Sequence, residues 1–364
     1  MKKIIPFLIM AVFVFATAGC GTAFESGVYK STDGGKTWQH LVSKDEGTTL
    51  LPPMDVTALV SDQVFTDTLY VGSKNKGVYK TIDGGKTWQA INNGLPKDGK
   101  GLKVTALAIN QLSGRTVYLA CMLDKYGRIF KSEDGGTSWK EIYAESEKNS
   151  RINALLTSAK EPGVLYLGTD KGGILKSTTY GESFTALKWL DRVAVTSLAI
   201  DPRDSKIIYA GTDNLMGVLK STDGGKTWNE TGAKNQDNVY QQSRKDFFIN
   251  CITVDPKNNK TVYAGTDQGI YVSRDQGTNW ELVNTLMPPK SGGVFSIAVG
   301  PQYGTIYFST EKILYKSINK GETWETSKLE TPGHVRFVIA DPFNVNLIYL
   351  GVGSLDKAKK GPLF

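Results

Sequence analysis

The sequence predicts an all-β fold: a seven-bladed β-propeller with four-stranded blades, closed by N- and C-terminal strands that share one blade. Three observations support this prediction. A short segment recurs seven times, short β-rich runs precede its copies, and turn-forming residues are frequent. Gly and Pro contribute 39 and 13 of the 364 residues, more than long helices tolerate and typical of a chain that turns often.

The repeated segment, called the box below, reads Ser-Thr-Asp-Gly-Gly-Lys-Thr-Trp in its first copy. The seven copies occupy residues 31–38, 81–88, 132–139, 177–184, 221–228, 273–280 and 317–324. Their final aromatic residues lie 44 to 52 residues apart. A period of that length indicates one small sheet per repeat, as in propellers.

Each repeat also contains strand-like runs before its box. Residues 195–200, 207–212 and 217–221 are short, β-rich and separated by turns, and they predict strands A, B and C of one blade. The end of the box begins strand D. Strands A of the seven repeats are expected to start near Val56, Val104, Ile152, Val195, Ile249, Val294 and Val335.

The two ends of the chain carry complementary halves of a blade. The chain begins with strands C and D, at residues 27–38, and ends with strands A and B, at residues 335–351. We expect residues 27–30 to pair with residues 347–350. This pairing would close the ring and leave no unpaired blade edge.

The box resembles the Asp-box of BNR (bacterial-neuraminidase-type) repeats, which occurs in sialidases, in two-domain xyloglucanases, in the sortilin luminal domain and, more loosely, in the photosystem II assembly and stability factor family. The resemblance covers essentially the whole mature chain. Seven spaced copies are strong support for the fold. They say little about function, because one fold hosts many activities.

The recurring polar residues of the box are expected to be structural. Asp and Ser oxygens would accept hydrogen bonds from turn amides, and the final aromatic residue would wedge between blades. The structural aspartates are Asp33, Asp83, Asp134, Asp223 and Asp275. Thr179 and Asn319 replace Asp in two boxes, and Phe184 replaces Trp, so the blade with Phe184 should be the least tightly fastened.

The N-terminus resembles a bacterial lipoprotein signal with its lipobox. Lys2 and Lys3 precede an apolar run at residues 4–16, and small residues precede Cys20. The expected organisation is a signal peptide at 1–19, an acylated linker at 20–25, the propeller at 26–353 and a tail at 354–364. A bacterial cell-envelope location follows, in the outer membrane or at the cell surface, with lipid attached at Cys20. A cleaved secretory signal is the alternative, and a transmembrane anchor fits less well because the run is short.

Composition excludes several classes of protein. Three Cys do not make a disulfide scaffold and two His do not make a usual zinc site, so no metal or cofactor is expected. Cys121 and Cys251 are expected to be buried thiols in different blades. Without residues 1–19, 41 basic residues face 36 acidic ones, a net charge of +5. Nucleic acid is not an expected partner outside the cytoplasm.

The ligand face is expected at the end of the ring formed by the B–C and D–A connections. Candidate residues there are mostly basic: Lys103, Arg151, Arg192, His334 and Arg336, with Tyr240 and Arg244 in the long D–A connection at residues 229–248. A cationic funnel would attract carboxylates, phosphates or acidic protein segments. The alternatives are polar groups that only solvate a channel, and an inert surface loop.

Three functions remain open: a non-catalytic scaffold that binds a protein, a glycosidase, and a glycan-binding module using Trp189, Tyr126 and Tyr240. Arg151, Arg192 and Arg336 could imitate the arginine triad of sialidases, but the Phe/Tyr-Arg-Ile-Pro motif is absent. Asp55 and Asp191 are the nearest carboxylates for inverting hydrolysis, and they are expected on opposite sides of the ring. The lipid-anchored scaffold is the favoured function.

Overall fold

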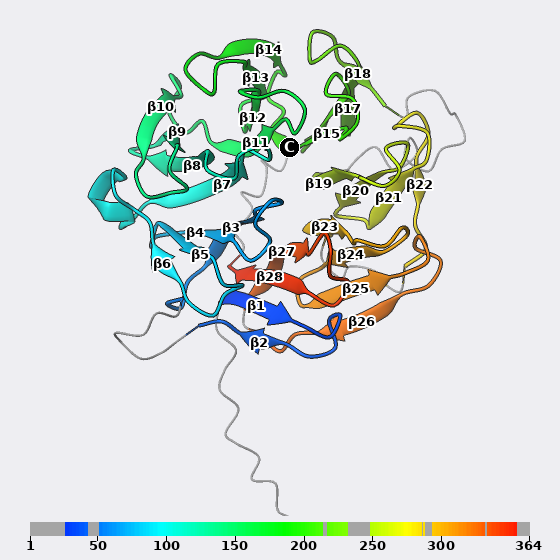
Figure 1. Ribbon diagram of the computed structural model, residues 1–364. Helices are drawn as coiled ribbons and strands as arrows, with labels where there is room; N and C mark the ends of the chain where they lie inside the picture. Colours follow the sequence, from blue (N-terminus) through cyan, green and yellow to red (C-terminus); the bar gives the residue numbers. More distant parts are fainter. Residues whose placement is uncertain are drawn as a thin grey trace, which may run out of the picture.

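The computed structural model describes residues 26–42, 51–213, 217–231, 248–285, 287, 293–331 and 333–354. Within them, the strands form seven four-stranded antiparallel sheets arranged as a ring (Figure 1). This confirms the predicted fold class. The one helix among these residues is a 3₁₀ turn, η1 (Pro96–Gly99). No described helix has the length and apolar character needed to cross a membrane.

Four strands, A to D from the axis outward, make each blade. Blade 1 contains β3 (Val56–Ser61), β4 (Leu69–Ser73), β5 (Val78–Thr81) and β6 (Gln89–Ala90). Blade 2 contains β7 (Lys103–Ile109), β8 (Val117–Leu123), β9 (Tyr126–Ser132) and β10 (Lys140–Ala144). Blade 3 contains β11 (Ile152–Thr157), β12 (Leu165–Thr169), β13 (Gly173–Ser177) and β14 (Thr185–Trp189).

The remaining blades repeat this order. Blade 4 contains β15 (Val195–Ile200), β16 (Ile208–Thr212), β17 (Val218–Ser221) and β18 (Asn229–Glu230). Blade 5 contains β19 (Ile249–Val254), β20 (Val262–Thr266), β21 (Ile270–Ser273) and β22 (Glu281–Leu282). Blade 6 contains β23 (Ser296–Val299), β24 (Ile306–Ser309), β25 (Ile313–Ser317) and β26 (Glu325–Lys328). Blade 7 contains β27 (His334–Ala340), β28 (Ile348–Gly353), β1 (Gly27–Ser31) and β2 (Gln39–His40).

Blade 7 closes the ring from both ends of the chain. Strand β1 pairs antiparallel with β28, with Tyr29 opposite Leu350, as the complementary half-blades predicted. Ser354, just past β28, donates hydrogen bonds from its amide and hydroxyl to Asp55 of blade 1, at 3.1 and 2.6 Å. Closure therefore ties the last described residue to the first blade.

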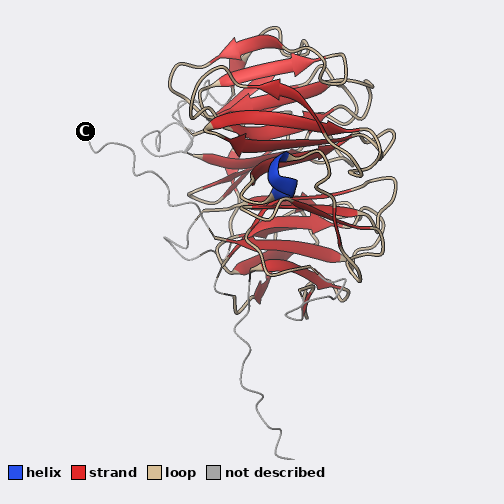
Figure 2. Cartoon of the chain, turned by 90° about the vertical axis from the view of Figure 1, so that its left-hand side faces the viewer, coloured by secondary structure: helices blue, strands red, loops and turns tan. Residues whose placement is uncertain are grey.

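Connections lie on two opposite faces of the ring (Figure 2). The B–C and D–A connections form one face, called the loop face below. The A–B turns and the boxes form the other, the turn face, where backbone hydrogen bonds such as Gly34 N–H to Asn346 O join box and turn of one blade. Each inner strand A begins at the loop face and ends at the turn face.

The box is a hydrogen-bonded turn, as its third copy, in blade 2, illustrates. Ser132 is buried, and its hydroxyl accepts the Gly136 amide at 2.7 Å while donating to Asp134 Oδ1 at 2.7 Å. Asp134 then accepts the amide and hydroxyl of Ser138 at 2.9 and 2.6 Å. Gly136, at φ +95°, takes the left-handed conformation that suits glycine.

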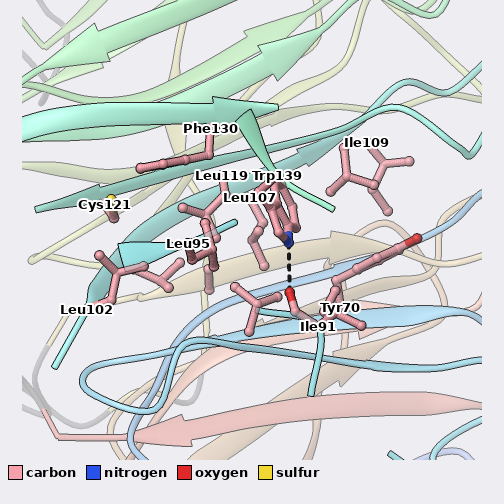
Figure 3. Close-up of a cluster of buried hydrophobic side chains, with 14 residues drawn as sticks. Tyr70, Ile91, Leu95, Leu102, Leu107, Ile109, Leu119, Cys121, Phe130 and Trp139 are labelled. Carbon is pink, nitrogen blue, oxygen red and sulfur yellow. Dashed lines mark hydrogen bonds between the residues drawn. The ribbon is translucent and has the colours of Figure 1, made fainter. Parts of the chain in front are cut away.

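Several joints between blades are made on the box of the following blade. Tyr70 Oη and Lys80 Nζ of blade 1 both donate to the Gly135 carbonyl of blade 2, at 3.1 and 2.9 Å. In return, the Trp139 indole of blade 2 donates to the Ile91 carbonyl at 2.7 Å (Figure 3). These polar contacts surround a shared cluster of buried apolar side chains.

The joints differ where the boxes differ. The lysine and tyrosine pair recurs at Gly84, from Lys30 and Tyr349, and at Gln276, from Lys220 and Tyr209. In blade 2, Lys131 instead pairs with Glu133 at 2.6 Å. In blade 5, Val272 occupies the position of the lysine. These two blades precede the boxes that carry Thr179 and Asn319 in place of Asp.

The described cysteines lie in different blades. Cys121 is buried in β8. Cys251 in β19 is half-buried, a departure from the expected full burial, and its sulfur lies against Gly265 of the neighbouring strand. Burial raises the pKa of the Cys121 thiol to about 12, which keeps it protonated.

We predict that Ser132→Ala lowers the free energy of unfolding by about 1–3 kcal/mol, because the Gly136 amide loses its acceptor in a buried position. Ser113→Ala, at an exposed turn position, is the control and should change little. Chemical denaturation measures both. An equal effect of the two substitutions would contradict the structural role of the box serine.

A second prediction concerns the stability of the fold at low pH. Hydrogen bonds from the amide and the hydroxyl of Thr227 lower the pKa of Asp223 to about 2. Because the pKa of this carboxyl group is lower in the folded chain than in the unfolded chain, the group stabilises the fold at pH values above its unfolded pKa. This contribution to the free energy of unfolding is lost as the pH falls to the pKa of the folded chain. Asp223→Asn should therefore reduce the loss of thermal stability between about pH 4 and pH 2.

The Asn319 box shows that an amide can fill this role. Asn319 accepts the Thr323 amide at 2.9 Å through Oδ1 and donates to the Thr323 hydroxyl at 2.9 Å. Asp223→Asn should therefore fold normally at neutral pH. Thermal unfolding followed by circular dichroism across this pH range tests the prediction, and a variant as acid-sensitive as the wild type would refute it.

Candidate functional site

Polar side chains enter the central channel from β-bulges in the inner strands. In six blades the pairing of strands A and B shifts register at one residue: Thr57, Thr105, Asn153, Thr196, Asn250 and Arg336. A bulge leaves one residue outside the ladder and re-aims its side chain. The repeated bulge therefore places a ring of polar groups near the loop face.

Three cations lie beside these groups. Lys103, Arg151 and Arg336 line a cavity of about 170 Å³ together with Thr57, Val104, Thr105, Asn153 and Thr196. We call this cavity the cationic mouth. None of its described lining residues is acidic. Three positive groups around a polar hollow favour an anionic ligand.

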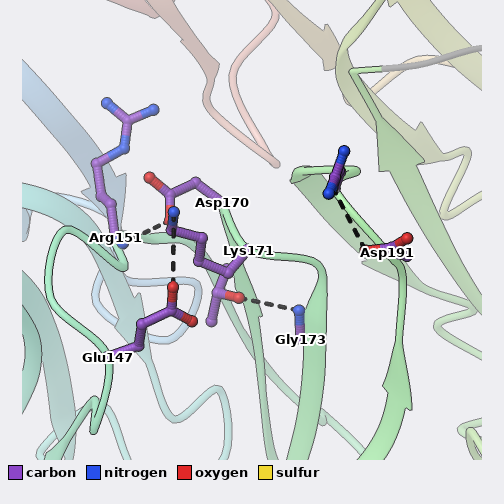
Figure 4. Close-up of polar contacts among 8 residues, drawn as sticks. Glu147, Arg151, Asp170, Lys171, Gly173 and Asp191 are labelled. Atoms are coloured by element: carbon purple, nitrogen blue, oxygen red, sulfur yellow. Dashed lines mark hydrogen bonds and ion pairs between the residues drawn. The ribbon is translucent and has the colours of Figure 1, made fainter.

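Hydrogen bonds position two of the cations. The Arg151 backbone amide donates to Asp170 Oδ1 at 2.7 Å, and its side-chain Nε donates to Asn153 Oδ1 at 2.6 Å. In Figure 4 the Arg151 side chain extends away from the neighbouring Glu147–Lys171 ion pair. Arg336 Nη1 donates to the Ser354 carbonyl at 3.3 Å. Positioned cations lose less conformational entropy when a ligand binds.

Some of the uncharged polar groups of the mouth bond the next blade, and one has no hydrogen-bond partner. Asn153 Nδ2 donates to the Val195 carbonyl, and Thr196 Oγ1 to the Ile249 carbonyl, so each joins its blade to the next. Thr105 Oγ1 is buried without a hydrogen-bond partner. A ligand in the mouth could therefore gain a hydrogen bond at Thr105.

The structure brings together Lys103, Arg151 and Arg336 of the predicted ligand-face residues and separates the others. Arg192 lies outside the mouth, because its D–A turn has φ +55° and its side chain is 93% exposed beside Asp191. His334 begins β27, and its ring makes an edge contact with Phe295. Tyr240, Arg244 and Cys20 lie outside the described residues.

The carboxylates considered for hydrolysis have other environments. Partial burial opposes ionisation of Asp55, but the hydrogen bonds from Ser354 outweigh it and hold the pKa below its usual value. A general acid needs a raised pKa instead. Asp191 has a side chain that is 97% exposed. Within the described ranges, no group of three or more His, Cys, Asp or Glu residues is arranged to hold a metal ion.

Sequence reasoning missed the uncharged half of the mouth. Thr57, Thr105, Asn153 and Thr196 each follow an apolar β-branched residue at or next to the start of an inner strand, as in Val-Thr-Ala and Ile-Asn-Ala. A polar residue at this position of successive repeats is a signal that an alignment of the repeats would have shown. The bulge explains why such residues are tolerated beside buried neighbours.

Trp189 is the other exposed feature named from the sequence. It ends β14, is 56% exposed, and its ring lies over Gly173, where an added Cβ would come within 2.8 Å of it. It is not part of the mouth lining.

Comparison with known proteins agrees with this architecture. The model of the BNR/Asp-box repeat matches residues 29–40. A xyloglucanase of Paenibacillus sp is 27% identical over 239 residues, covering 54% of this chain and 23% of the enzyme. Xyloglucanase Xgh74A of Acetivibrio thermocellus is 26% identical over 214 residues, covering 48% and 24%. The chain thus spans about a quarter of the length of these relatives.

Solved structures share the fold at low sequence identity. The GH74 xyloglucanase of Xanthomonas campestris aligns with TM-score 0.69 and 16% identity, covering 82% of this chain and 51% of the enzyme. YCF48 bound to D1 peptide aligns with TM-score 0.60 and 16% identity, covering 85% of this chain and 95% of YCF48. The resemblance to Asp-box propellers is therefore confirmed, at the level of repeat and fold.

Proposed function

We propose that this propeller is a non-catalytic scaffold that binds an acidic segment of a partner protein at the cationic mouth. The observation that carries the proposal is the convergence of Lys103, Arg151 and Arg336, from three blades, on one polar cavity. The similarity in fold to YCF48, whose structure was solved with a peptide bound, supports a peptide ligand.

A glycan is the second candidate, because the curated relatives are xyloglucanases. The environments of the two candidate carboxylates weigh against hydrolysis. Asp55 is hydrogen-bonded to Ser354 and Asp191 is exposed, so neither resembles the general acid of an inverting pair.

We also propose that the scaffold is tethered to the bacterial cell envelope through lipid on Cys20. Residues 20–25 would link the lipid to Ser26, which precedes β1 at the loop face. Six extended residues span at most about 20 Å. The cationic mouth would then face the membrane surface, where the acidic segment of a membrane protein could reach it.

We predict that the mature chain binds a fluorescein-labelled oligoglutamate peptide, and that Lys103→Glu or Arg336→Glu weakens binding about tenfold or more by placing an acid in the mouth. Salt should weaken the wild-type interaction, because exposed charges are screened within about 10 Å at 0.1 M. Fluorescence anisotropy measures both effects.

Arg192→Glu is the matched control, since it reverses an exposed cation on the same face outside the mouth. Equal weakening by this variant would show a diffuse charge effect and refute the site. Hydrolysis of xyloglucan by the wild-type chain, abolished in Asp55→Asn with the fold intact, would replace the scaffold with a glycosidase.

A separate prediction concerns the tether. Cys20→Ala should move the protein from the membrane to the soluble fraction or block its maturation, because the thioether attachment point is lost. Cell fractionation and intact-mass analysis measure this. Unchanged fractionation of the variant, together with no acyl mass on the wild type, would disprove the anchor.

A further inference from the structure

The turn face, opposite the cationic mouth, repeats one turn in most blades. The residue that ends strand A accepts backbone amides two and three residues later; Asp341, for example, accepts those of Phe343 and Asn344 at 2.8 and 2.7 Å. Asp62, Ser158, Asp201 and Asp255 do the same in blades 1, 3, 4 and 5, and Asn110 accepts the Leu112 amide in blade 2. The residue two positions after the acceptor therefore occupies an equivalent turn tip.

These tips divide the face into two halves. In blades 7, 1 and 2 the tips are apolar and exposed: Phe343 at 78%, Val64 at 52% and Leu112 at 51%. In blades 3, 4 and 5 they are Lys160, Arg203 and Lys257, which we call the basic tips. Nothing in the hydrogen bonding of the turn requires either choice, because the bonded groups are backbone amides.

More exposed apolar side chains extend the first half. Phe65 follows Val64, Ile82 and Ile318 hold the second box position in blades 1 and 6, and Tyr303 lies in the blade 6 turn. We call these residues with the three apolar tips the apolar arc: Tyr303, Ile318, Phe343, Val64, Phe65, Ile82 and Leu112. They are between 51% and 78% exposed, and they occupy four consecutive blades. Exposed apolar groups gathered on one face are the residues from which an interaction surface can be built.

Two hollows open on this face. A cavity of about 640 Å³ between blades 1 and 2 is lined by Val64, Phe65 and Ile82 of the arc, together with the charged Lys80, Arg115, Asp62, Asp67 and Asp134. A second, of about 340 Å³, lies at the turn-face ends of inner strands of blades 1, 2, 3, 6 and 7 and is lined mainly by apolar groups such as Leu59, Leu107 and Val338. Hollows of this kind accept the buried anchor side chains that dominate protein interfaces.

The positive charge of the half formed by blades 3 to 5 indicates the charge that a partner should carry. The A–B turns of blades 3 to 5 expose five basic side chains, Lys160, Arg203, Lys206, Lys257 and Lys260, against the acidic Glu161 and Asp204. A partner that covers both halves must present apolar side chains beside acidic ones.

The tether proposed above favours a protein over a lipid bilayer as the partner of the turn face. Ser26, to which the linker would attach, lies at the loop face, and about 20 Å of extended chain would not let the opposite face rest on the same membrane. This step rests on the proposed function, whereas the division of the face does not.

We propose that the turn face is a second docking surface, for a protein segment whose apolar side chains fill the two hollows and whose acidic side chains face the basic tips. The ring would then hold two partners on opposite faces, one at the cationic mouth and one at the apolar arc.

A phage-displayed library of random peptides, selected on the mature full-length ring, provides the probe. Selected peptides should combine apolar and acidic residues. A synthesised peptide should bind the double variant Phe65→Ser, Phe343→Ser about tenfold or more weakly, because the anchors are lost. Lys160→Glu with Lys257→Glu should weaken binding and reduce its dependence on salt.

Two controls distinguish this proposal from the proposed function. Arg336→Glu, in the cationic mouth, and Trp189→Ser, an exposed apolar residue outside the arc, should leave binding of the peptide unchanged. Circular dichroism melting verifies that every variant folds. Loss of peptide binding in Arg336→Glu alone would assign the peptide to the mouth and overturn the second surface.

Other outcomes also overturn the proposal. These are no enrichment of peptides, or binding insensitive to the Phe65 and Phe343 substitutions. Association with vesicles of phosphatidylglycerol and phosphatidylethanolamine that is lost in Phe65→Ser, Phe343→Ser would make the arc a membrane surface. Concentration-dependent dimerisation lost in the same variant would make it a contact between copies.

Discussion

Three joints of the ring depend on a box carbonyl group that a lysine and a tyrosine of the preceding blade hold in place. Tyr70 and Lys80 donate to the Gly135 carbonyl of the next box, and Trp139 of that box donates back to Ile91. The same box supplies its own turn geometry through Ser132 and Asp134. One short segment therefore stabilises both the turn within a blade and the joint between blades. This double role explains why the box repeats so faithfully while other parts of the repeat diverge.

A ring fastened at its boxes and outer strands leaves other positions free to vary. Six inner strands carry a bulge near their start, and the A–B turns are held by bonds to backbone amides, so the side chain at the turn tip is not fixed by the turn itself. Asn153, Thr196 and Arg203 at these positions bond a neighbouring blade. At the other bulges and turn tips the chemistry can change with little cost in stability, which is the arrangement that a binding scaffold requires.

The sequence predicted the fold well because the box carries its geometry locally: spacing, glycines and the aromatic residue all lie within eight positions. It predicted the cations of the mouth, Lys103, Arg151 and Arg336, because they lie just before or near the start of inner strands. The sequence did not distinguish Arg192 from the cations of the mouth, although its left-handed turn exposes its side chain to solvent. It also missed Thr105 and Asn153. A bulge inserts one unpaired residue, and the regular alternation of a strand does not anticipate it.

Function in a ring of similar blades must arise where the blades differ. Seven identical blades would present a symmetric surface. A partner without that symmetry would then find the same contacts at every blade and would have no single preferred position. Here the differences are concentrated. Cations reach the mouth from blades 2, 3 and 7, while exposed apolar tips occupy blades 7, 1 and 2 and basic tips blades 3 to 5. Because these asymmetries lie on opposite faces and share no side chain, each can be tuned without disturbing the other. The rigid joints between blades hold the two surfaces at a fixed separation.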